Sequence, residues 1–170
     1  LAIHCMICCI INLCPRLIFA HTNFFYYNMA FDEYALEQLP LDEPLFYLWQ
    51  NRSAVIIGIN QNIYTEVDLD YARQHDIAVA RRITGGGAVY HDLGNLNFTF
   101  LMSQADYDLD KQMKVIQNAV ESCGIHTERS GRNDILAEGQ KFSGNAFYKN
   151  GNVFATVSGT SQILNFKGTY

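Results

Sequence analysis

The chain has 170 residues, of which 49% are hydrophobic and 17% are charged. This length fits one domain, and the apolar fraction excludes a disordered chain. Seventeen acidic residues against 12 basic ones give a net charge of -5. That balance argues against a protein built to coat nucleic acid, and it still allows one anionic ligand held by a local Arg/Lys pair.

The N-terminal segment is the most apolar part of the chain. Residues 1–14 contain four of the five cysteines, Cys5, Cys8, Cys9 and Cys14. An odd, clustered set gives no disulfide framework, and the Cys5–Cys8 pair lacks the second ligand pair that a structural zinc site needs. We therefore expect no metal site and reduced cysteines in a cytoplasmic protein. The apolar run is too short to span a bilayer. We interpret residues 1–15 as an extension, whether an added strand, a non-native segment or a membrane anchor, and 16–170 as the domain.

The first half of the domain mixes one helix with short strands. Apolar residues Tyr27, Ala30, Phe31 and Tyr34 recur at helical spacing and predict a helix over 26–38, which Pro40 ends. Apolar runs at 45–49 and 54–59 predict two neighbouring buried strands. Residues 68–75 predict helical turns with Asp68 as N-cap, and 77–81 a further strand.

The second half predicts a strand-rich region around one helix. Strand-like runs lie at 88–91 and 96–102, and a helix is expected over 109–123, with Cys123 on its apolar face and Gly124 at its end. Strands follow at 125–128 and 133–137, and two more, 142–148 and 152–158, are joined by a hairpin at Asn150-Gly151. Strands outnumber helices, which predicts an α+β fold with a mainly antiparallel sheet and helices packed on it.

A triple glycine, Gly85-Gly86-Gly87, follows Arg81-Arg82. Glycines allow a ligand to approach the backbone closely, with N–H groups free to point at it, and an adjacent arginine is a natural partner for carboxylate or phosphate. A plain hairpin turn explains the same glycines. The spacing matches neither the Walker loop nor the dinucleotide fingerprint.

Two further segments carry polar residues of interest. The run from His91 to Asn97 contains a histidine that could act as a base, although Asp, Gly and Asn in a row more often build a turn. Lys141 stands between Gly139 and Gly144, where it could place a point charge on a phosphate or simply be solvated at a hairpin end.

Together these segments resemble one family. The stretches RRITGGGAVYHDLGNLNFTF and GRNDILAEGQKFSGNAF, with YYNMAFDEYALEQ, LFYLWQN and VIIGINQN upstream in the same order, closely resemble the lipoate-protein ligase A family from about Arg16 to about Phe154. The resemblance implies the catalytic fold shared by biotin ligases, lipoate ligases and octanoyl transferases, here incomplete at its C-terminal side.

The resemblance implies a reaction and its residues. Such ligases activate lipoate with ATP and Mg²⁺ to lipoyl-adenylate. They then transfer the lipoyl group to a lysine of a lipoyl domain, as in 2-oxo-acid dehydrogenase complexes and the glycine-cleavage H protein. Arg82 and Lys141 would be catalytic, since fixed cations stabilise the charge that develops when a carboxylate attacks the α-phosphorus. The residues implied to bind the adenylate are Arg82, Thr84, Gly85, Gly86, Gly87, His91, Asn95, Asp134, Lys141, Ser143 and Ala146.

The sequence departs from the family at one segment. Members carry a His-His-Gly-Thr-Leu-Leu-like stretch after the lysine strand, whereas residues 156–164 keep only Gly159-Thr160 of it. Two alternatives to ligation therefore stay open. An octanoyl transferase works through a cysteine thioester, for which Cys123 would be a poor nucleophile if it lies on an apolar helix face. A non-catalytic module would hold lipoate or adenylate without turnover.

Overall fold

The computed structural model describes residues 14–131 and 134–160, and it confirms the α+β fold with a mainly antiparallel sheet. No helix in these residues is both long and apolar enough to cross a membrane. The helices are α2 (Phe25–Gln38), α3 (Ile63–Glu66), α4 (Leu69–Gln74) and α5 (Leu109–Glu121). The strands are β1 (Arg16–Phe19), β2 (Leu45–Trp49), β3 (Ala54–Ile57), β4 (Ala78–Arg81), β5 (Val89–His91), β6 (Leu96–Ser103), β7 (Thr127–Ser130), β8 (Asp134–Ala137), β9 (Gln140–Asn150) and β10 (Val153–Thr160).

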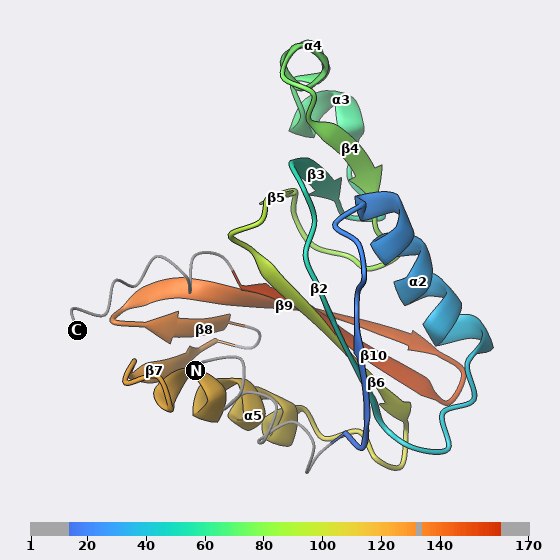
Figure 1. Ribbon diagram of the computed structural model, residues 1–170, viewed down its shortest axis with the longest axis vertical. Coiled ribbons are helices and arrows are strands. Elements are labelled where there is room, and N and C mark those ends of the chain that lie inside the picture. Colours follow the sequence, from blue (N-terminus) through green and yellow to red (C-terminus); the bar gives the residue numbers. More distant parts are fainter. Residues whose placement is uncertain (1–13, 132–133, 161–170) are drawn as a thin grey trace.

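A seven-stranded sheet in the order β1-β2-β6-β10-β9-β8-β7 forms the body of the molecule (Figure 1). Its strand pairs are antiparallel except β1 with β2. The strand β10 is central: it pairs with β6 on one side and with β9 on the other. The regions on either side of β10, which are distant in sequence, are therefore joined through this one strand.

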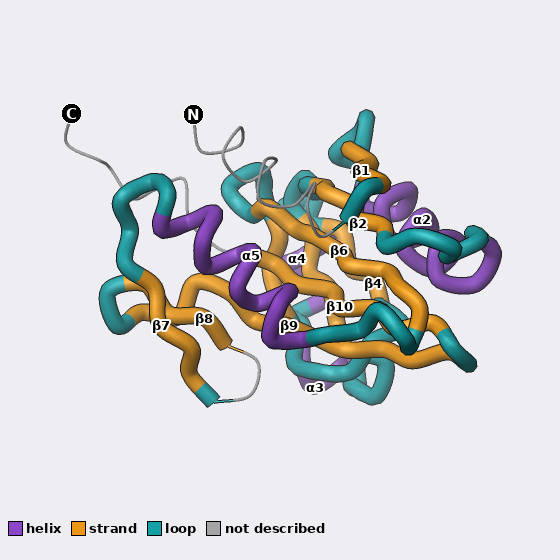
Figure 2. The backbone as a smooth tube through the Cα atoms, turned by 90° about the horizontal axis from the view of Figure 1, so that it is seen from below, coloured by secondary structure: helices purple, strands orange, loops and turns teal. Residues whose placement is uncertain are grey.

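Helix α5 covers one face of this sheet, as Figure 2 shows from below. Its apolar residues Met113, Ile116 and Val120 pack against Phe98 and Phe100 of β6 in the main core cluster. The three helix residues have the spacing that the sequence predicted for an amphipathic helix. Asp108 caps the helix, because its Oδ1 accepts a hydrogen bond of 3.0 Å from the Lys111 amide. The predicted helix is confirmed, and this face of the sheet provides the core.

Helix α2 covers part of the other face, but the predicted apolar face of this helix was wrong. Tyr27 and Tyr34 are exposed, and the helix instead buries Phe25, Asn28, Asp32, Ala35 and Leu36. The physical reason is that Asn28 and Asp32 find hydrogen-bond partners in the sheet below them. Burial of paired polar side chains does not follow the hydrophobic pattern on which the prediction rested.

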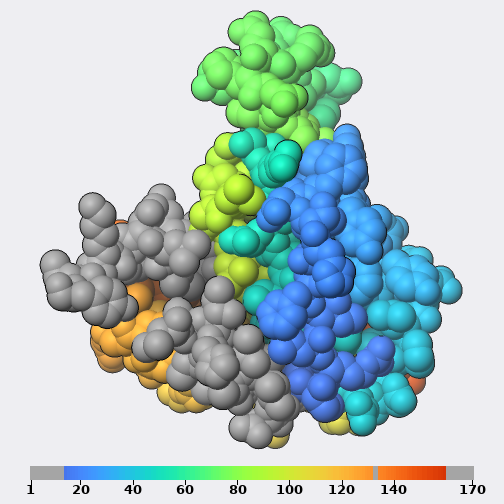
Figure 3. Space-filling view, in the orientation of Figure 1, coloured from blue at the N-terminus to red at the C-terminus, as the bar shows by residue number. Residues whose placement is uncertain are grey.

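A second, three-stranded sheet, β4-β3-β5, stands beside the first. The runs predicted as neighbouring strands, β2 and β3, do not pair, because both edges of β2 are already paired with β1 and β6. Beyond this sheet, α3 and α4 project from the body of the molecule (Figure 3). Asp68 caps α4 as predicted, accepting a bond of 2.9 Å from the Tyr71 amide. The short helix α3 was not predicted.

Two predicted boundaries in the second half are shifted. The β9–β10 hairpin turns at Gly151-Asn152, one residue later than predicted, since Asn150 still pairs with Val153 and Gly151 supplies the positive φ of 57°. Strand β7 begins at Thr127 rather than 125, because its register with β8 starts at the Thr127–Ala137 pair. The preceding helix ends at Glu121, two residues earlier than predicted, and Gly124, with φ 82°, lies in the turn that follows it.

The cysteine predictions are partly tested. Cys14 is buried and Cys123 exposed, and both are free thiols. Placing Cys123 on the apolar face of α5 was wrong: it lies beyond the last helical residue, where the chain turns away from the core. The Cys5–Cys8 pair, most of the extension at 1–15 and residues 161–164 lie outside the described residues.

Candidate active site

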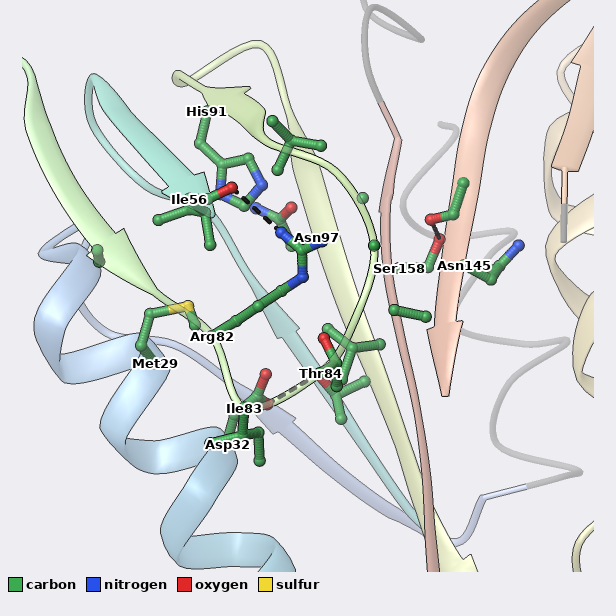
Figure 4. A pocket seen from close by; sticks show the side chains of 18 of the residues that line it. Met29, Asp32, Ile56, Arg82, Ile83, Thr84, His91, Asn97, Asn145 and Ser158 are labelled. Carbon is green, nitrogen blue, oxygen red and sulfur yellow. Dashed lines mark hydrogen bonds between the residues drawn. The ribbon is translucent and has the colours of Figure 1, made fainter. Parts of the chain in front are cut away.

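One large cavity of about 1010 Å³ lies between the two sheets and α2 (Figure 4). Its lining comes from α2, from β2 to β6 with the segment after β4, and from β8, β9 and β10. The structure brings all the predicted binding residues to this one cavity: Arg82, Thr84, Gly85, Gly86, Gly87, His91, Asn95, Asp134, Lys141, Ser143 and Ala146. Residues up to 64 positions apart in sequence thus face a single space.

The side chain of Arg82 holds the glycine loop in place through hydrogen bonds. Its guanidinium donates to the carbonyl oxygens of Gly85 (2.8 Å from Nη2), Gly87 (2.7 Å from Nη2) and Ile56 (3.1 Å from Nη1). These bonds tie the loop after β4 to strand β3. At Gly86 the φ angle is 98°, and a Cβ there would lie 2.8 Å from Arg82 Nη2. The positive φ angle therefore favours glycine at this position, and a side chain there would also have to displace the Arg82 guanidinium.

The charge of Arg82 is half-buried and has no acidic partner. No carboxylate within the described residues forms an ion pair with it. Burial lowers its pKa from the ordinary value, although an arginine stays protonated at neutral pH. A half-buried cation without a carboxylate partner favours an anionic ligand, because the ligand would supply the missing negative charge.

A second glycine, Gly58, supports this loop from β3. A Cβ at Gly58 would clash with the carbonyl oxygen of Gly86. Arg81 fixes the turn that follows Gly58, since its Nη1 donates to the carbonyls of Gly58 (2.9 Å) and Gln61 (2.7 Å). The two adjacent arginines therefore hold two different loops, and Gly58 allows these loops to touch.

The opposite wall carries Lys141, from β9. Its Nζ lies 2.9 Å from Asp134 Oδ1 of β8, and its side chain is 55% exposed. Gly144 lies close beneath, where a Cβ would approach Lys141 Nζ to 3.3 Å. Lys141 is thus a partly exposed cation at the cavity wall, and its ion pair with Asp134 fixes its orientation. Ser143, next to this wall, is buried and bonds Ser158 Oγ at 2.9 Å.

His91 is buried at the end of β5. Its Nδ1 contacts Asn51 Nδ2 at 3.1 Å, and its ring meets Trp49 edge-on with centroids 5.8 Å apart. Burial, with the nearby charge of Arg82, lowers the pKa of His91 to about 4. The histidine is therefore neutral at physiological pH. Asn95 bonds the Tyr90 carbonyl at 2.8 Å, which gives it a part in the turn after β5.

Sequence reasoning missed the polar residues that α2 and β6 bring to the cavity. Asp32 accepts a bond of 2.8 Å from Thr99 Oγ1, and Thr99 Oγ1 also accepts from Trp49 Nε1 at 3.3 Å. Burial raises the pKa of Asp32 to about 7. The one available signal was a buried-strand position that carries Thr99 instead of an apolar residue, and no periodicity argument extends that to a partner on α2.

Two buried polar atoms on the cavity have no partner within the described chain, Thr84 Oγ1 and Asn97 Nδ2. Asn97 lies opposite Gly159 in the β6–β10 register, where a Cβ would stand 2.8 Å from Asn97 Oδ1. Orphaned buried donors and acceptors beside a space that a side chain would fill are typical of a ligand site. The cavity therefore combines a glycine loop held by a half-buried arginine, apolar walls and two buried polar atoms without a partner in the described chain.

Residues 25–165 match the sequence model of the lipoyl protein ligase A/B catalytic domain, so the chain belongs to that family. The lipoate–protein ligase 1 of Staphylococcus aureus is 45% identical over 125 residues, which is 72% of this chain and 38% of that protein. The LplJ ligase of Bacillus subtilis is 39% identical over 132 residues, 75% of this chain and 40% of that protein. The chain thus spans about two fifths of the length of these curated relatives.

Solved structures of ligases superpose on this chain. P. falciparum LipL1 in complex with lipoate superposes with a TM-score of 0.80 at 32% identity, covering 88% of this chain and 50% of that one. Lipoate-protein ligase A bound with ATP gives 0.75 at 31%, covering 85% and 65%. A bipartite ligase from Thermoplasma acidophilum, described with its E2 lipoyl domain, gives 0.76 at 31%, covering 85% and 60%.

Proposed function

We propose that this chain carries the catalytic chemistry of an ATP-dependent lipoate–protein ligase. The observation that supports it most directly is that the glycine loop with Arg82 and the strand pair with Asp134 and Lys141 face one cavity. Membership of the lipoyl ligase family adds support, as do relatives whose structures hold lipoate or ATP. The acceptor would be the lysine of a lipoyl domain, as the Thermoplasma ligase with its E2 domain suggests.

In the first proposed step a carboxylate oxygen of lipoate attacks the α-phosphorus of ATP. An oxygen–phosphorus bond forms, the bond between the α- and β-phosphates breaks, and pyrophosphate leaves. Two anions are brought together, so fixed cations and N–H dipoles lower the barrier. Lys141 and Arg82 are the cations on opposite walls, and the backbone of Gly85 and Gly87 is open to a ligand, because nothing lies within 4 Å of where their Cβ atoms would be.

In the second step the amine of the acceptor lysine attacks the acyl carbon. An amide forms, AMP leaves with the former carboxylate oxygen, and the amine loses a proton. The mixed anhydride is reactive enough that no protein nucleophile is needed. None of the described residues that line the cavity is a cysteine, and Cys123 lies outside it, which favours this route over a thioester.

Magnesium fits the same site. In the described ranges no three His, Cys, Asp or Glu side chains are placed to hold a metal ion. Mg²⁺ is usually bound through one or two carboxylates together with substrate phosphates, so such a cluster is not required. Asp134, beside Lys141, is the carboxylate that would complete the coordination of an ion arriving with ATP.

The test is to mix the chain with ATP, Mg²⁺, lipoate and an apo lipoyl domain, and to weigh the acceptor by mass spectrometry. We expect a lipoyl mass increment that disappears when ATP is omitted. An octanoyl mass increment that appears without ATP when an octanoylated carrier is supplied would favour the transferase. Adenylate held on the chain, with no modified acceptor, would favour a non-catalytic module. No binding and no transfer would reject the proposal.

A further inference from the structure

A buried hydrogen-bond chain runs from Tyr47 through Asn28 and Asn51 to His91, linking α2 and β2 to β5 (Figure 4 shows His91 at the cavity). Tyr47 Oη donates to Asn28 Oδ1 at 2.9 Å, Asn28 Nδ2 donates to Asn51 Oδ1 at 3.0 Å, and Asn51 Nδ2 contacts His91 Nδ1 at 3.1 Å. Both asparagines are fully buried, and neither lines the cavity.

The orientation of each amide in this chain follows from its backbone partners. Asn28 Nδ2 also faces the carbonyl oxygens of Thr22 (3.1 Å) and Gln50 (2.9 Å), which only accept hydrogen bonds. That end of Asn28 is therefore the NH₂ group, whose two hydrogens are shared among three oxygens. An oxygen of Asn51 fits the 3.0 Å contact, because an NH₂ group there would set two donors against each other. The NH₂ group of Asn51 is then left to face His91.

A donor facing His91 Nδ1 makes that nitrogen an acceptor, so the proton of the neutral ring sits on Nε2. Protonation of Nδ1 would set two donors against each other at 3.1 Å. Nε2 has no hydrogen-bond partner in the described chain, and it lies 3.9 Å from where a Cβ of Gly159 would stand. The same glycine leaves space beside the unpaired Asn97 amide.

We propose that Asn51 and Asn28 are positioning residues that hold His91 in the Nε2–H tautomer, so that the cavity presents a neutral hydrogen-bond donor beside Gly159 to an acceptor atom of the acyl ligand. A neutral donor suits this place, since a second cation near the half-buried Arg82 would raise the electrostatic cost of the empty site. The identity of the ligand rests on the proposed function, whereas the tautomer does not.

The tautomer is tested by long-range proton–nitrogen NMR of the histidine rings, with His91 assigned by its loss in His91→Gln. At pH 7 we expect an unprotonated Nδ1 and a protonated Nε2. A protonated Nδ1 in the unsubstituted chain would overturn the proposal.

Asn51→Asp is the sharpest variant, because it keeps the shape of the side chain and replaces the donor with an acceptor. One carboxylate oxygen can still accept from Asn28, while the other would draw a proton onto His91 Nδ1. The NMR signature of His91 should switch in Asn51→Asp and not in Asn118→Asp, which adds the same charge at an exposed position of α5. A His91 signal that stays unchanged in Asn51→Asp counts against the proposal.

Calorimetry then tests whether the Nε2–H group of His91 contributes to ligand binding. Lipoate affinity should fall roughly tenfold in Asn51→Asp and stay constant in Asn118→Asp. An equal fall for octanoate identifies the acceptor as the carboxyl group, and a fall for lipoate alone identifies it as the dithiolane. Unchanged affinity for both acids overturns the ligand part of the proposal. If the unsubstituted chain shows the expected tautomer and binds neither acid, the proposed function fails and the positioning role stands.

Discussion

At the scale of single residues, the role of Lys141 depends on its charge rather than on burial. Its ammonium is aligned by Asp134 at 2.9 Å and remains half-exposed, so a phosphate can replace solvent around it. We expect Lys141→Gln to lower the rate of lipoyl transfer about a hundredfold, which is the typical loss when one preorganised donor is removed from a transition state. The measurement is initial rate by mass spectrometry of the acceptor domain.

The matched control for this variant is Lys114→Gln, which removes the same charge from the exposed side of α5. Its rate should equal that of the unsubstituted chain. If both variants lose the same activity, the effect comes from net charge, and Lys141 has no special place in the reaction.

Cys123 provides a second test at this scale. The thiol is exposed and bonds only neighbouring groups of its own segment, with Sγ 3.4 Å from the Ala119 carbonyl. Because it does not line the cavity, Cys123→Ala should retain full transfer activity. Loss of activity in this variant, measured with intact Lys141, would restore the thioester route of the transferases.

Asp32 makes stability depend on pH. Its pKa is 3.8 in the ordinary state and about 7 in the fold, so the folded chain holds a proton that the unfolded chain has released between these values. Stability due to this group is therefore present at low pH and is lost as pH rises through 7. Asp32→Asn keeps an acceptor for Thr99 and should raise the free energy of unfolding at pH 8, by roughly 4 kcal/mol at most.

The free energy of unfolding of Asp32→Asn and of the unsubstituted chain can be measured in urea at pH 4 and pH 8. The fluorescence of the single tryptophan, the buried Trp49, reports the unfolding. The gain should shrink towards pH 4. The surface variant Asp42→Asn should show no such gain at either pH. His91 acts in the opposite direction, since its lowered pKa makes stability fall as pH drops from 6.5 to about 4. Arg82 and Asp92 are the charged groups that influence it, and neither changes in this comparison.

At the scale of elements, the contact between two loops sets the shape of the cavity wall that contains the glycine loop. Gly58 follows β3, Gly86 follows β4, and a Cβ on the first would strike the carbonyl of the second. Gly58→Ala should destabilise the chain by about 1–3 kcal/mol, as overpacking does, and displace the glycine loop. Thermal unfolding of Gly58→Ala and Gly85→Ala compares a blocked position with an open one, because a Cβ at Gly85 meets nothing within 4 Å. Equal melting temperatures would contradict this account.

Some elements of the fold could be predicted from the sequence, and others could not. Helix α5, buried strands β2 and β6 and the cap at Asp68 followed from local periodicity and side-chain chemistry, which act within a few residues. The buried face of α2 did not, because Asn28 and Asp32 depend on Tyr47 and Thr99, which lie at least 19 positions away. The glycine loop after Arg82 and the segment at Lys141 were singled out from their own residues, and the family resemblance then implied their roles. Gly58, Asn51 and Asn97 act through contacts that no local pattern reveals.

At the scale of the whole molecule, the main apolar core and the cavity lie on opposite faces of the large sheet. One face holds α5 and the main apolar cluster, and the other carries α2 and the cavity. Ile116→Ala, at the centre of the α5 contact, should lower the free energy of unfolding by about 2–5 kcal/mol. Lipoate affinity, measured by calorimetry well below the melting temperature, should not change. A parallel loss of affinity would show that the two faces are coupled.

The central place of β10 also orders events during synthesis of the chain. The glycine loop connects β4 to β5 of the smaller sheet, ahead of β6 in the chain, and Lys141 lies on β9 of the larger sheet. In the described part of the chain, β10 is the strand that pairs with both β6 and β9. A ribosome makes β10 after both. Until it emerges, a nascent chain carries Arg82 and Lys141 without the strand that pairs with both β6 and β9, so we expect ligand capture to wait for this late strand.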